Sequence, residues 1–487
     1  MIDVCLLLEG TYPYVAGGVS TWIHQLISSM KNIHFGIVYI APHSDPTRRM
    51  KYEMPSQVLS LKEIYLHDYQ LSHAKSRQPK ARDYEIIKKF YKEILVDQQD
   101  ELFPEFIKLF QRDGGCFDGN TLFSSKEIWD ILTEFYDAHS PDISFLDYFW
   151  TWRGTHLPLF QILQADIPRA KIYHAVSTGY AGLLGSMAKN RYGGKFFLTE
   201  HGIYTHERML EISQANWIYE QEKKNYRAER ELSFFKQWWI GIFSVLSRLT
   251  YNTTDRIFTL YEGNRIREIL EGANPTKISL IPNGIDIQGA KAISRQKKEF
   301  PQIGLIGRVV NIKDIKTYIQ AARLTLQKIP QAKFYILGPT EEEGEYFEEC
   351  KMLVEALQLQ NHIVFTGRVN LQEYYSFLDV VVLTSLSEAQ PYVILEANIV
   401  GIPVVATNVG ACREMLEGGS AEDQALGMSG LITEVTNPES TSASIVRLLE
   451  DKEFYNKCAA SGIERVKKYY DQDDLLSRYL NIYEQNL

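Results

Sequence analysis

Short apolar runs alternate along the chain with longer segments in which apolar residues recur at helical spacing. In the first half, the runs that predict strands are Asp3–Leu8, Phe35–Ile40, Ile143–Leu146, Lys171–Val176, Phe196–Thr199, Arg256–Leu260 and Ile278–Ile281. In the second half they are Ile303–Ile306, Lys333–Leu337, Ile363–Thr366, Val380–Leu383 and Val404–Ala406. Strands that alternate with helices in this way form parallel sheets, so the pattern predicts an α/β protein.

The strands fall into two series, which predicts two Rossmann-like domains. The second series begins after the segment IPNGID, so we expect an N-terminal domain over residues 1–285 and a C-terminal domain over residues 286–470. The stretch from about residue 42 to 141 is too long for an ordinary α/β connection and predicts a helical insertion in the first domain. Residues 471–487 have apolar positions at helical spacing and predict a last helix that packs back toward the N-terminal domain.

Composition places the chain among globular proteins. Of its 487 residues, 45% are hydrophobic and 23% are charged, which is close to the average of folded domains. The net charge of −9 provides no general basic field, so nucleic acid is not an expected partner, although a local basic cleft could hold a diphosphate. Five cysteines lie far apart without a C-x-x-C pair, which argues against a zinc site or a disulfide framework and fits a reducing cytoplasm.

The sequence predicts neither a signal peptide nor a membrane span. The first residues, MIDVCLLLEG, lack a basic region before their apolar run, and we interpret them as a buried first strand. The longest uncharged apolar stretch, Gln237–Ser247, is far shorter than the roughly 20 residues that a spanning helix needs. We therefore expect a cytoplasmic location.

Two glycines, Gly17 and Gly18, lie between the first predicted strand and an apolar helix. Glycines at this position allow the backbone to approach a ligand, and the following helix N-terminus favours an anion. A tight turn without a ligand is an equally good interpretation. The segment is not a G-x-G-x-x-G dinucleotide fingerprint, which is found nowhere in the chain.

In the second domain, Arg308 and Lys313 follow the strand Ile303–Ile306 in the segment GRVVNIKD. Ligands of open α/β sheets gather at the carboxyl ends of the strands, where two cations would suit a diphosphate. The alternative is that both are ordinary solvated loop residues.

The segment Ser385–Thr407 holds two carboxylates, Glu388 in a loop and Glu396 in the helix that begins near Tyr392. An apolar helix gains little packing from a carboxylate in its first turns, so Glu396 is a candidate to accept hydrogen bonds from ligand hydroxyls. The helix N-terminus beside it offers N–H groups to a phosphate. A first-turn acid that only complements the helix dipole is the competing explanation.

These residues carry a family resemblance. The spacing Glu388-x7-Glu396, together with the glycine pair, IPNGID, Arg308, Lys313 and TGRV at Thr366–Val369, resembles the retaining GT-B glycosyltransferases of the glycogen-synthase-like, UDP-sugar-using type. Within that family the chain is most similar to the PelF-like enzymes of Pel exopolysaccharide synthesis, through the segments at 3–20, 174–185, 198–208 and 260–273. The resemblance implies two Rossmann-like domains that face each other across a cleft.

The resemblance also implies roles on the donor side. Glu396 would bind the ribose hydroxyls, Glu388 the hydroxyls of the donor sugar, and Arg308 with Lys313 the diphosphate. Gly17 and Gly18 would lie over the diphosphate. The other residues expected to border the nucleotide sugar are Arg368, Val369, Gln390, Tyr392, Val393 and Leu395. The loop AQPYV replaces a Gly-Phe-Gly-like segment of many relatives, so Gln390 and Tyr392 would shape the choice of sugar, with UDP-glucose favoured and a UDP-N-acetylhexosamine possible.

On the acceptor side, the resemblance implies a catalytic position for His174 at the sugar end of the cleft, although a hydrogen-bonded core histidine is the alternative. Glu200 and His201 follow the next strand and would face the acceptor. Arg208 would point there too, or lie on the surface.

The family implies transfer with retention by front-face attack, in which the leaving phosphate takes the acceptor's proton. We expect no metal or other cofactor, because the one D-x-D, at Asp471–Asp473, is better interpreted as a helix start. The expected partners are a UDP-sugar, a growing polysaccharide and inner-membrane subunits of a Pel-type synthase, at whose membrane face the protein would be peripheral. The rival function is an idle GT-B subunit that docks through the aromatic segment Asn216–Thr250, which is otherwise a core stripe.

Overall fold

The computed structural model describes residues 2–68, 77–93, 100–111, 115–117, 122, 125–139, 143–214, 233–291 and 293–487. The chain divides into two compact units. Unit 1 comprises Met1–Thr259, Arg265–Ser279 and Leu480–Leu487, and unit 2 comprises Leu260–Asn264 and Leu280–Tyr479. The last residues of the chain are therefore part of the first unit.

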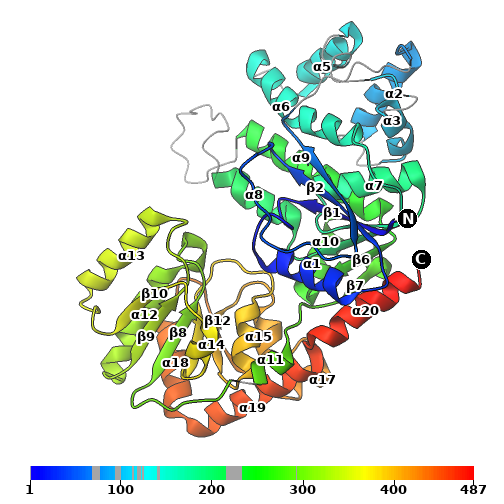
Figure 1. The fold of residues 1–487 in the computed structure, drawn as a ribbon. Helices are drawn as coiled ribbons and strands as arrows, with labels where there is room; N and C mark the ends of the chain where they lie inside the picture. Colours follow the sequence, from blue (N-terminus) through cyan, green and yellow to red (C-terminus); the bar gives the residue numbers. More distant parts are fainter. Residues whose placement is uncertain are drawn as a thin grey trace. The chain divides into compact units, whose positions relative to one another are not determined.

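Unit 1 is built on a seven-stranded sheet with the strand order β3-β2-β1-β4-β5-β6-β7. Strands β1, β2, β6 and β7 of this sheet are labelled in Figure 1. The strands are β1 Ile2–Glu9, β2 Phe35–Ala41, β3 Val58–Tyr65, β4 Ala170–Ala175, β5 Lys195–Glu200, β6 Arg256–Thr259 and β7 Ile278–Leu280. The neighbouring pairs from β3 to β6 are parallel. Such a sheet is buried on both faces, which is why its central strands are continuous apolar runs.

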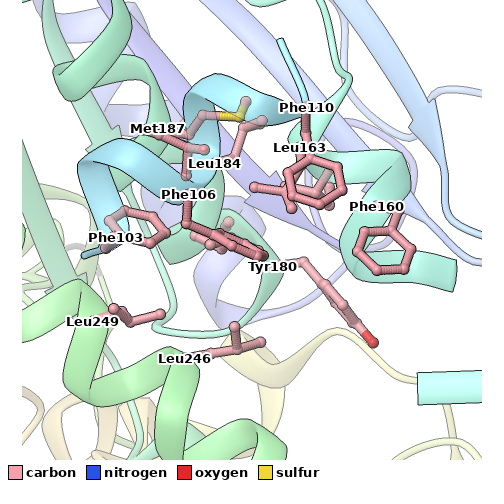
Figure 2. Close-up of a cluster of buried hydrophobic side chains, with 14 of the residues drawn as sticks. Phe103, Phe106, Phe110, Phe160, Leu163, Tyr180, Leu184, Met187, Leu246 and Leu249 are labelled. Carbon is pink, nitrogen blue, oxygen red and sulfur yellow. The ribbon is translucent and has the colours of Figure 1, made fainter. Parts of the chain in front are cut away.

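Helices cover both faces of this sheet. They are α1 Gly18–Ser29, α7 Tyr180–Tyr192, α8 Tyr204–Gln214, α9 Phe234–Thr253 and α10 Glu262–Leu270. A further group consists of α2 Ala81–Lys92, α3 Phe103–Leu109, α5 Lys126–His139 and α6 Phe145–Leu163. A short 3₁₀ turn lies at Pro275–Lys277. On one face, Cys5, Tyr173 and Leu198 join the core formed with α3, α6, α7 and α9. Figure 2 shows part of this core, where Phe103 and Phe106 of α3 lie opposite Leu246 and Leu249 of α9.

Unit 2 contains a six-stranded parallel sheet with the order β10-β9-β8-β11-β12-β13 (Figure 1). Its strands are β8 Gln302–Ile306, β9 Lys333–Leu337, β10 Ile363–Gly367, β11 Val380–Leu383, β12 Val404–Thr407 and β13 Gly430–Thr433. Its helices are α11 Ile287–Lys291, α12 Ile315–Lys328, α13 Gly344–Ala356, α14 Leu371–Tyr375, α15 Tyr392–Ile399, α16 Cys412–Glu417, α17 Ala421–Gln424, α18 Pro438–Glu450 and α19 Lys452–Tyr469, with a 3₁₀ turn at Asn311–Lys313. The last helix, α20 Gln472–Glu484, begins in unit 2, and its residues from Leu480 onward belong to unit 1. The residues of β11 alternate between two cores, Val381 and Leu383 facing α15, and Val380 and Val382 facing α12 and α18.

The α/β class and the two Rossmann-like domains of the sequence prediction are confirmed. Three details differ. Residues Ile143–Leu146, predicted as a strand, include the start of α6, because the apolar run is the first turn of a longer helical pattern. Strand β3 lies inside the stretch predicted as a helical insertion, and β13 was not predicted at all. Both are edge strands, and β3 is mostly half-exposed, so neither has the continuous apolar run of a central strand.

Within the described parts of the chain, no helix combines the length and the apolar character that crossing a bilayer requires.

Candidate functional site

The candidate donor residues of unit 2 lie in the loops that follow β8, β10 and β11 and on helix α15, which comes after β11. The loop after β8 is fastened to the end of β11, because the Thr384 hydroxyl donates to the carbonyls of Lys313 and Asp314, both at 2.9 Å. The Leu386 N–H donates to the Ile312 carbonyl at 2.8 Å. These bonds hold the segment that carries Lys313 beside the segment that carries Glu388.

Lys313 and Glu388, which the sequence analysis assigned to the donor diphosphate and the donor sugar, form an ion pair. Their side chains are 21% and 13% exposed, and the Ser385 hydroxyl donates to the same Glu388 carboxylate oxygen at 2.7 Å. A largely buried ammonium group next to a carboxylate can bind a phosphate oxygen and a sugar hydroxyl at neighbouring points. The pair therefore combines both kinds of group at one sheet edge of unit 2.

Arg308 is placed differently. Its side chain is 53% exposed, and its guanidinium group pairs with Glu342, with a distance of 2.7 Å between Nη1 and Oε2. The structure thus pairs Lys313 with Glu388, whereas Arg308 pairs with the exposed Glu342. An exposed pair of this kind is weak, so the guanidinium group can exchange Glu342 for an anion at low cost.

Glu396 lies on α15 and accepts a 2.7 Å hydrogen bond from the Tyr375 hydroxyl. Burial raises the pKa of the Glu396 carboxyl, and this bond partly offsets the shift. Burial, followed by the nearby Glu396 charge, also raises the pKa of the Tyr392 hydroxyl. Among the described residues no side chain caps the N-terminus of α15, where the Ile394 N–H donates to the Pro391 carbonyl at 3.2 Å. An uncapped helix N-terminus favours an anion.

The other predicted donor residues occupy varied positions. Val393 is half-buried, and the Leu395 side chain is 1% exposed in the core, so only its backbone could face a ligand. Gln390 is buried, and its side-chain oxygen accepts from the Asn283 N–H at 2.6 Å, which ties the IPNGID segment to the loop before α15. Arg368 is exposed and Val369 half-buried in the turn after β10.

A glycine missed by the sequence analysis shapes this site. Gly410, after β12, has φ +53°, and a Cβ built on it would lie 2.0 Å from the Glu388 carbonyl oxygen. The neighbouring Ala411 N–H donates to the Ala389 carbonyl at 2.8 Å. Only glycine allows this approach of two loops. A glycine four residues after the predicted strand Val404–Ala406 was the available signal.

In unit 1, Gly17 and Gly18 are exposed at the start of α1, whose N-terminus has no side-chain cap among the described residues. A Cβ built on Gly17 meets nothing within 4 Å, and its backbone is extended. The packing of unit 1 therefore does not require glycine at position 17. Both interpretations of the pair remain compatible with this placement.

His174 is fully buried in unit 1. Its Nδ1 lies 2.5 Å from the Tyr483 hydroxyl and its Nε2 lies 2.8 Å from the Thr199 hydroxyl. Burial lowers its pKa to about 3, so the ring is neutral at physiological pH. This placement favours the core histidine over the catalytic position that the resemblance implied, because both ring nitrogens are engaged inside the domain.

Glu200, His201 and Arg208, expected on the acceptor side, are close in sequence but differ in exposure. Glu200 is 1% exposed and accepts from the Tyr251 hydroxyl at 2.7 Å. His201 is also buried, which lowers its pKa to about 4. Arg208 is half-buried and pairs with Glu211 at 2.8 Å. Of the three, Arg208 is the most accessible to an acceptor.

Glu9 at the end of β1 is a second residue that the sequence analysis missed. Its carboxylate accepts from the Tyr204 hydroxyl at 2.6 Å and from the Tyr180 N–H at 3.0 Å. Burial raises its pKa, and the charge of Arg208 acts in the opposite direction. Glu9 thus joins the start of α7 to the start of α8, the helix that carries Arg208.

The aromatic segment at 216–250 lies partly outside the described residues, and Trp217 is among those outside. Within α9, Phe235 and Phe243 are buried, and Trp238 donates to the Thr155 hydroxyl at 3.2 Å. This part of the segment therefore contributes to the core of unit 1. No group of three or more His, Cys, Asp or Glu side chains in the described ranges is arranged to hold a metal ion.

Comparison with family models gives one match for each half of the chain. Residues 2–276 match the model described as "Domain of unknown function (DUF3492)", which covers more than half of the chain. Residues 286–465 match "Glycosyl transferases group 1".

Two of the curated proteins that this chain resembles are named as a glycosyltransferase and a galactosyltransferase. The uncharacterised glycosyltransferase MJ1607 of Methanocaldococcus jannaschii is 26% identical over 56% of this chain and 67% of its own length. The UDP-Gal:α-D-GlcNAc-diphosphoundecaprenol α-1,3-galactosyltransferase of Escherichia coli is 26% identical over 44% of this chain, and the match spans about half, 54%, of that enzyme.

Solved structures share the fold over nearly the whole chain. Anabaena Alr3699/HepE in complex with UDP has a TM-score of 0.59 at 13% identity, covering 99% of this chain and 100% of that one. Sucrose-phosphate synthase of Thermosynechococcus elongatus has a TM-score of 0.58 at 16% identity, covering 99% and 98%. Residues 286–465 thus match the model of the group 1 glycosyl transferases, and the fold is the GT-B fold of these solved structures. The family model that matches more than half of the chain is DUF3492, so the chain belongs to the DUF3492 family.

Proposed function

We propose that the protein transfers a sugar from a UDP-sugar to a growing exopolysaccharide, with retention at the anomeric carbon and UDP-glucose as the favoured donor. The observation that carries the proposal is the Lys313–Glu388 ion pair in the loops that follow β8 and β11, with Glu388 four residues before the start of α15. The solved relative Alr3699/HepE has been crystallised with UDP and with UDP-glucose, which supports a nucleotide sugar of this type as donor.

The proposed chemistry follows from where charge develops. Cleavage of the bond between the sugar and the diphosphate leaves negative charge on the leaving phosphate. Lys313 and the N–H groups of α15 stabilise this charge, and Arg308 joins them after leaving Glu342. The leaving phosphate takes the proton of the acceptor hydroxyl as the new glycosidic bond forms on the same face of the sugar. Glu388 and Glu396 hold sugar and ribose hydroxyls, and no metal ion takes part.

Release of UDP tests the proposal. We expect steady UDP release from UDP-glucose, or from a UDP-N-acetylhexosamine, when a polysaccharide acceptor is present. A Glu388→Gln variant should lose this activity, because an amide cannot keep both the Lys313 pair and the hydroxyl contacts. A matched Glu342→Gln variant, which changes only the exposed partner of Arg308, should keep it.

The alternative, an idle assembly subunit, predicts no UDP release with any donor in a panel of nucleotide sugars. Calorimetric titration of the same panel identifies the donor, since only the correct sugar should bind more tightly than UDP alone.

We further propose that the protein works at the cytoplasmic face of the membrane with Pel-type synthase subunits. The support is the similarity to PelF-like enzymes together with the similarity to a transferase whose name specifies a membrane-lipid-linked acceptor. Fractionation should find the protein in the membrane pellet only when those subunits are expressed with it. Recovery in the pellet without them would overturn dependence on the partners.

A further inference from the structure

The helices of unit 1 surround a cavity of about 450 Å³, and none of the candidate site residues is among its described lining residues. Its wall comes from α2, α3, α5, α6, α7 and α9 and includes Phe90, Phe106, Phe135 and Trp152. The lining also includes Phe103 and Phe106 of α3 and Leu246 and Leu249 of α9, whose side chains are drawn in Figure 2. An engineered apolar cavity of about 150 Å³ stays dry and binds benzene. A larger apolar cavity is thus suited to an apolar ligand.

The cavity reaches the surface along one face of α9. Gly241 and Ser244 are exposed, Arg248 is half-buried, and all three line the cavity. Their spacing places them on the same face of the helix. Gly241 stands in the interior of α9, where glycine is less favourable than alanine. A Cβ built on it meets nothing within 4 Å, so the mouth is open at this point.

Arg248 provides a charge at this mouth. Among the described lining residues it is the one with a permanent charge. His156 also lines the cavity, but burial lowers its pKa to about 4, and its Nδ1 lies 2.8 Å from the Trp152 carbonyl oxygen. Tyr91 and Tyr148 are neutral as well, because burial raises the pKa of both hydroxyls. An apolar interior with one cation at its mouth complements a molecule that has a hydrocarbon chain and an anionic head.

We propose that this cavity binds the hydrocarbon chain of an anionic lipid, with the head group at Arg248. The inference is independent of the proposed sugar transfer, since it uses no residue of the donor or acceptor sites. A fatty acyl chain and a polyprenyl phosphate share this chemistry. Each buried methylene should strengthen binding by about fourfold, until the chain fills the cavity.

Calorimetric titration of the full chain with octanoate, laurate and palmitate, each below its micellar concentration, tests the proposal. We expect affinity to rise along the series. Farnesyl phosphate forms a second arm, and the tighter of palmitate and farnesyl phosphate identifies the source of the chain. Absence of binding by all four probes would overturn the proposal.

Two glycine variants locate the ligand. Gly241→Leu places a side chain in the mouth, and it should reduce palmitate affinity at least about tenfold while the protein stays folded. Gly154→Leu is the matched control, because Gly154 is also within a helix with nothing within 4 Å of an added Cβ, but it does not line the cavity. Equal effects of the two variants, or no effect of Gly241→Leu, would contradict the assigned cavity.

A third variant tests the head group. Arg248→Gln should weaken palmitate binding by roughly tenfold or more and leave the binding of neutral hexadecanol within about twofold, because a charge-assisted hydrogen bond is lost only with the anion. A parallel loss for both probes would refute the role of Arg248.

Discussion

Replacing Glu268 with glutamine should make the protein more stable at neutral pH, and increasingly so as the pH rises. Glu268 lies on α10 and is 0% exposed, and Glu200 at the end of β5 is 1% exposed. Burial, then the charges of neighbouring carboxylates, raises the pKa of Glu200 to about 8 and that of Glu268 to about 9. For Glu268 the neighbours are Glu200 and Glu271, and Arg265 acts in the opposite direction.

The sign of the pH dependence follows from these shifts. Because the folded pKa lies above the unfolded value of 4.5, the carboxyl group contributes its full stability below pH 4.5 and loses it as the pH rises through about 9. At pH 7.5, which is 3 pH units above the unfolded pKa of 4.5, ionisation of this carboxyl group stabilises the unfolded chain by about 4 kcal/mol, at 1.36 kcal/mol per unit. Glutamine has nearly the same volume and no charge in either state. We therefore expect Glu268→Gln to gain about 2 to 4 kcal/mol at pH 7.5, but under about 1 kcal/mol at pH 5.

Urea unfolding of the wild type and the variant at pH 5, 6 and 7.5 measures this difference. Glu53→Gln is the control, since Glu53 is exposed in the same unit, and it should change stability little at any of these pH values. A Glu268→Gln variant that is destabilised, or that is stabilised equally at all three pH values, would refute the argument.

Three further predictions concern the donor half of the site. Arg308→Ala and Lys313→Ala should each lower kcat by roughly 100- to 1000-fold in steady-state kinetics, with little change in the donor Kd. Glu396→Ala should mainly raise the donor Kd, which calorimetry measures. Near-normal turnover of the Arg308→Ala, Lys313→Ala double variant would contradict these roles. Donor affinity should be the same in the presence of EDTA, and its loss in chelator would show that a metal is needed. Gly410→Ala should lower Tm and weaken donor binding, because the added Cβ would meet the Glu388 carbonyl oxygen at 2.0 Å, and a variant that matches the wild type in both measurements would disprove this constraint.

The sequence predicted the central strands of both sheets because these strands are apolar on both faces. Strand β3 was not predicted, because apolar and polar residues alternate only weakly in its sequence, VLSLKEIY, and most of them are half-exposed at the edge of the sheet. The Ile143–Leu146 run shows the opposite difficulty, since a short apolar run does not distinguish a strand from the first turn of a helix. Neighbours along the chain decide such cases.

For the site, the sequence placed Lys313 and Glu388 at the carboxyl edge of the second sheet, since both lie in loops that follow predicted strands. It could not supply Tyr375 as the partner of Glu396 or Thr384 as the anchor of the Lys313 loop, because these contacts depend on tertiary packing between separate loops. For His174 the sequence left two interpretations open. The choice between them depends on Tyr483, which is 309 residues away in the chain.

The hydrogen bond between His174 and Tyr483 also affects how the protein folds during synthesis. Unit 1 leaves the ribosome first, but its last segment, Leu480–Leu487, is translated only after the whole of Leu280–Tyr479. At about 5 to 20 residues per second, those roughly 200 residues take about 10 to 40 s. During that interval the His174 ring lacks its Tyr483 partner. Unit 1 is therefore synthesised first but completes its core last.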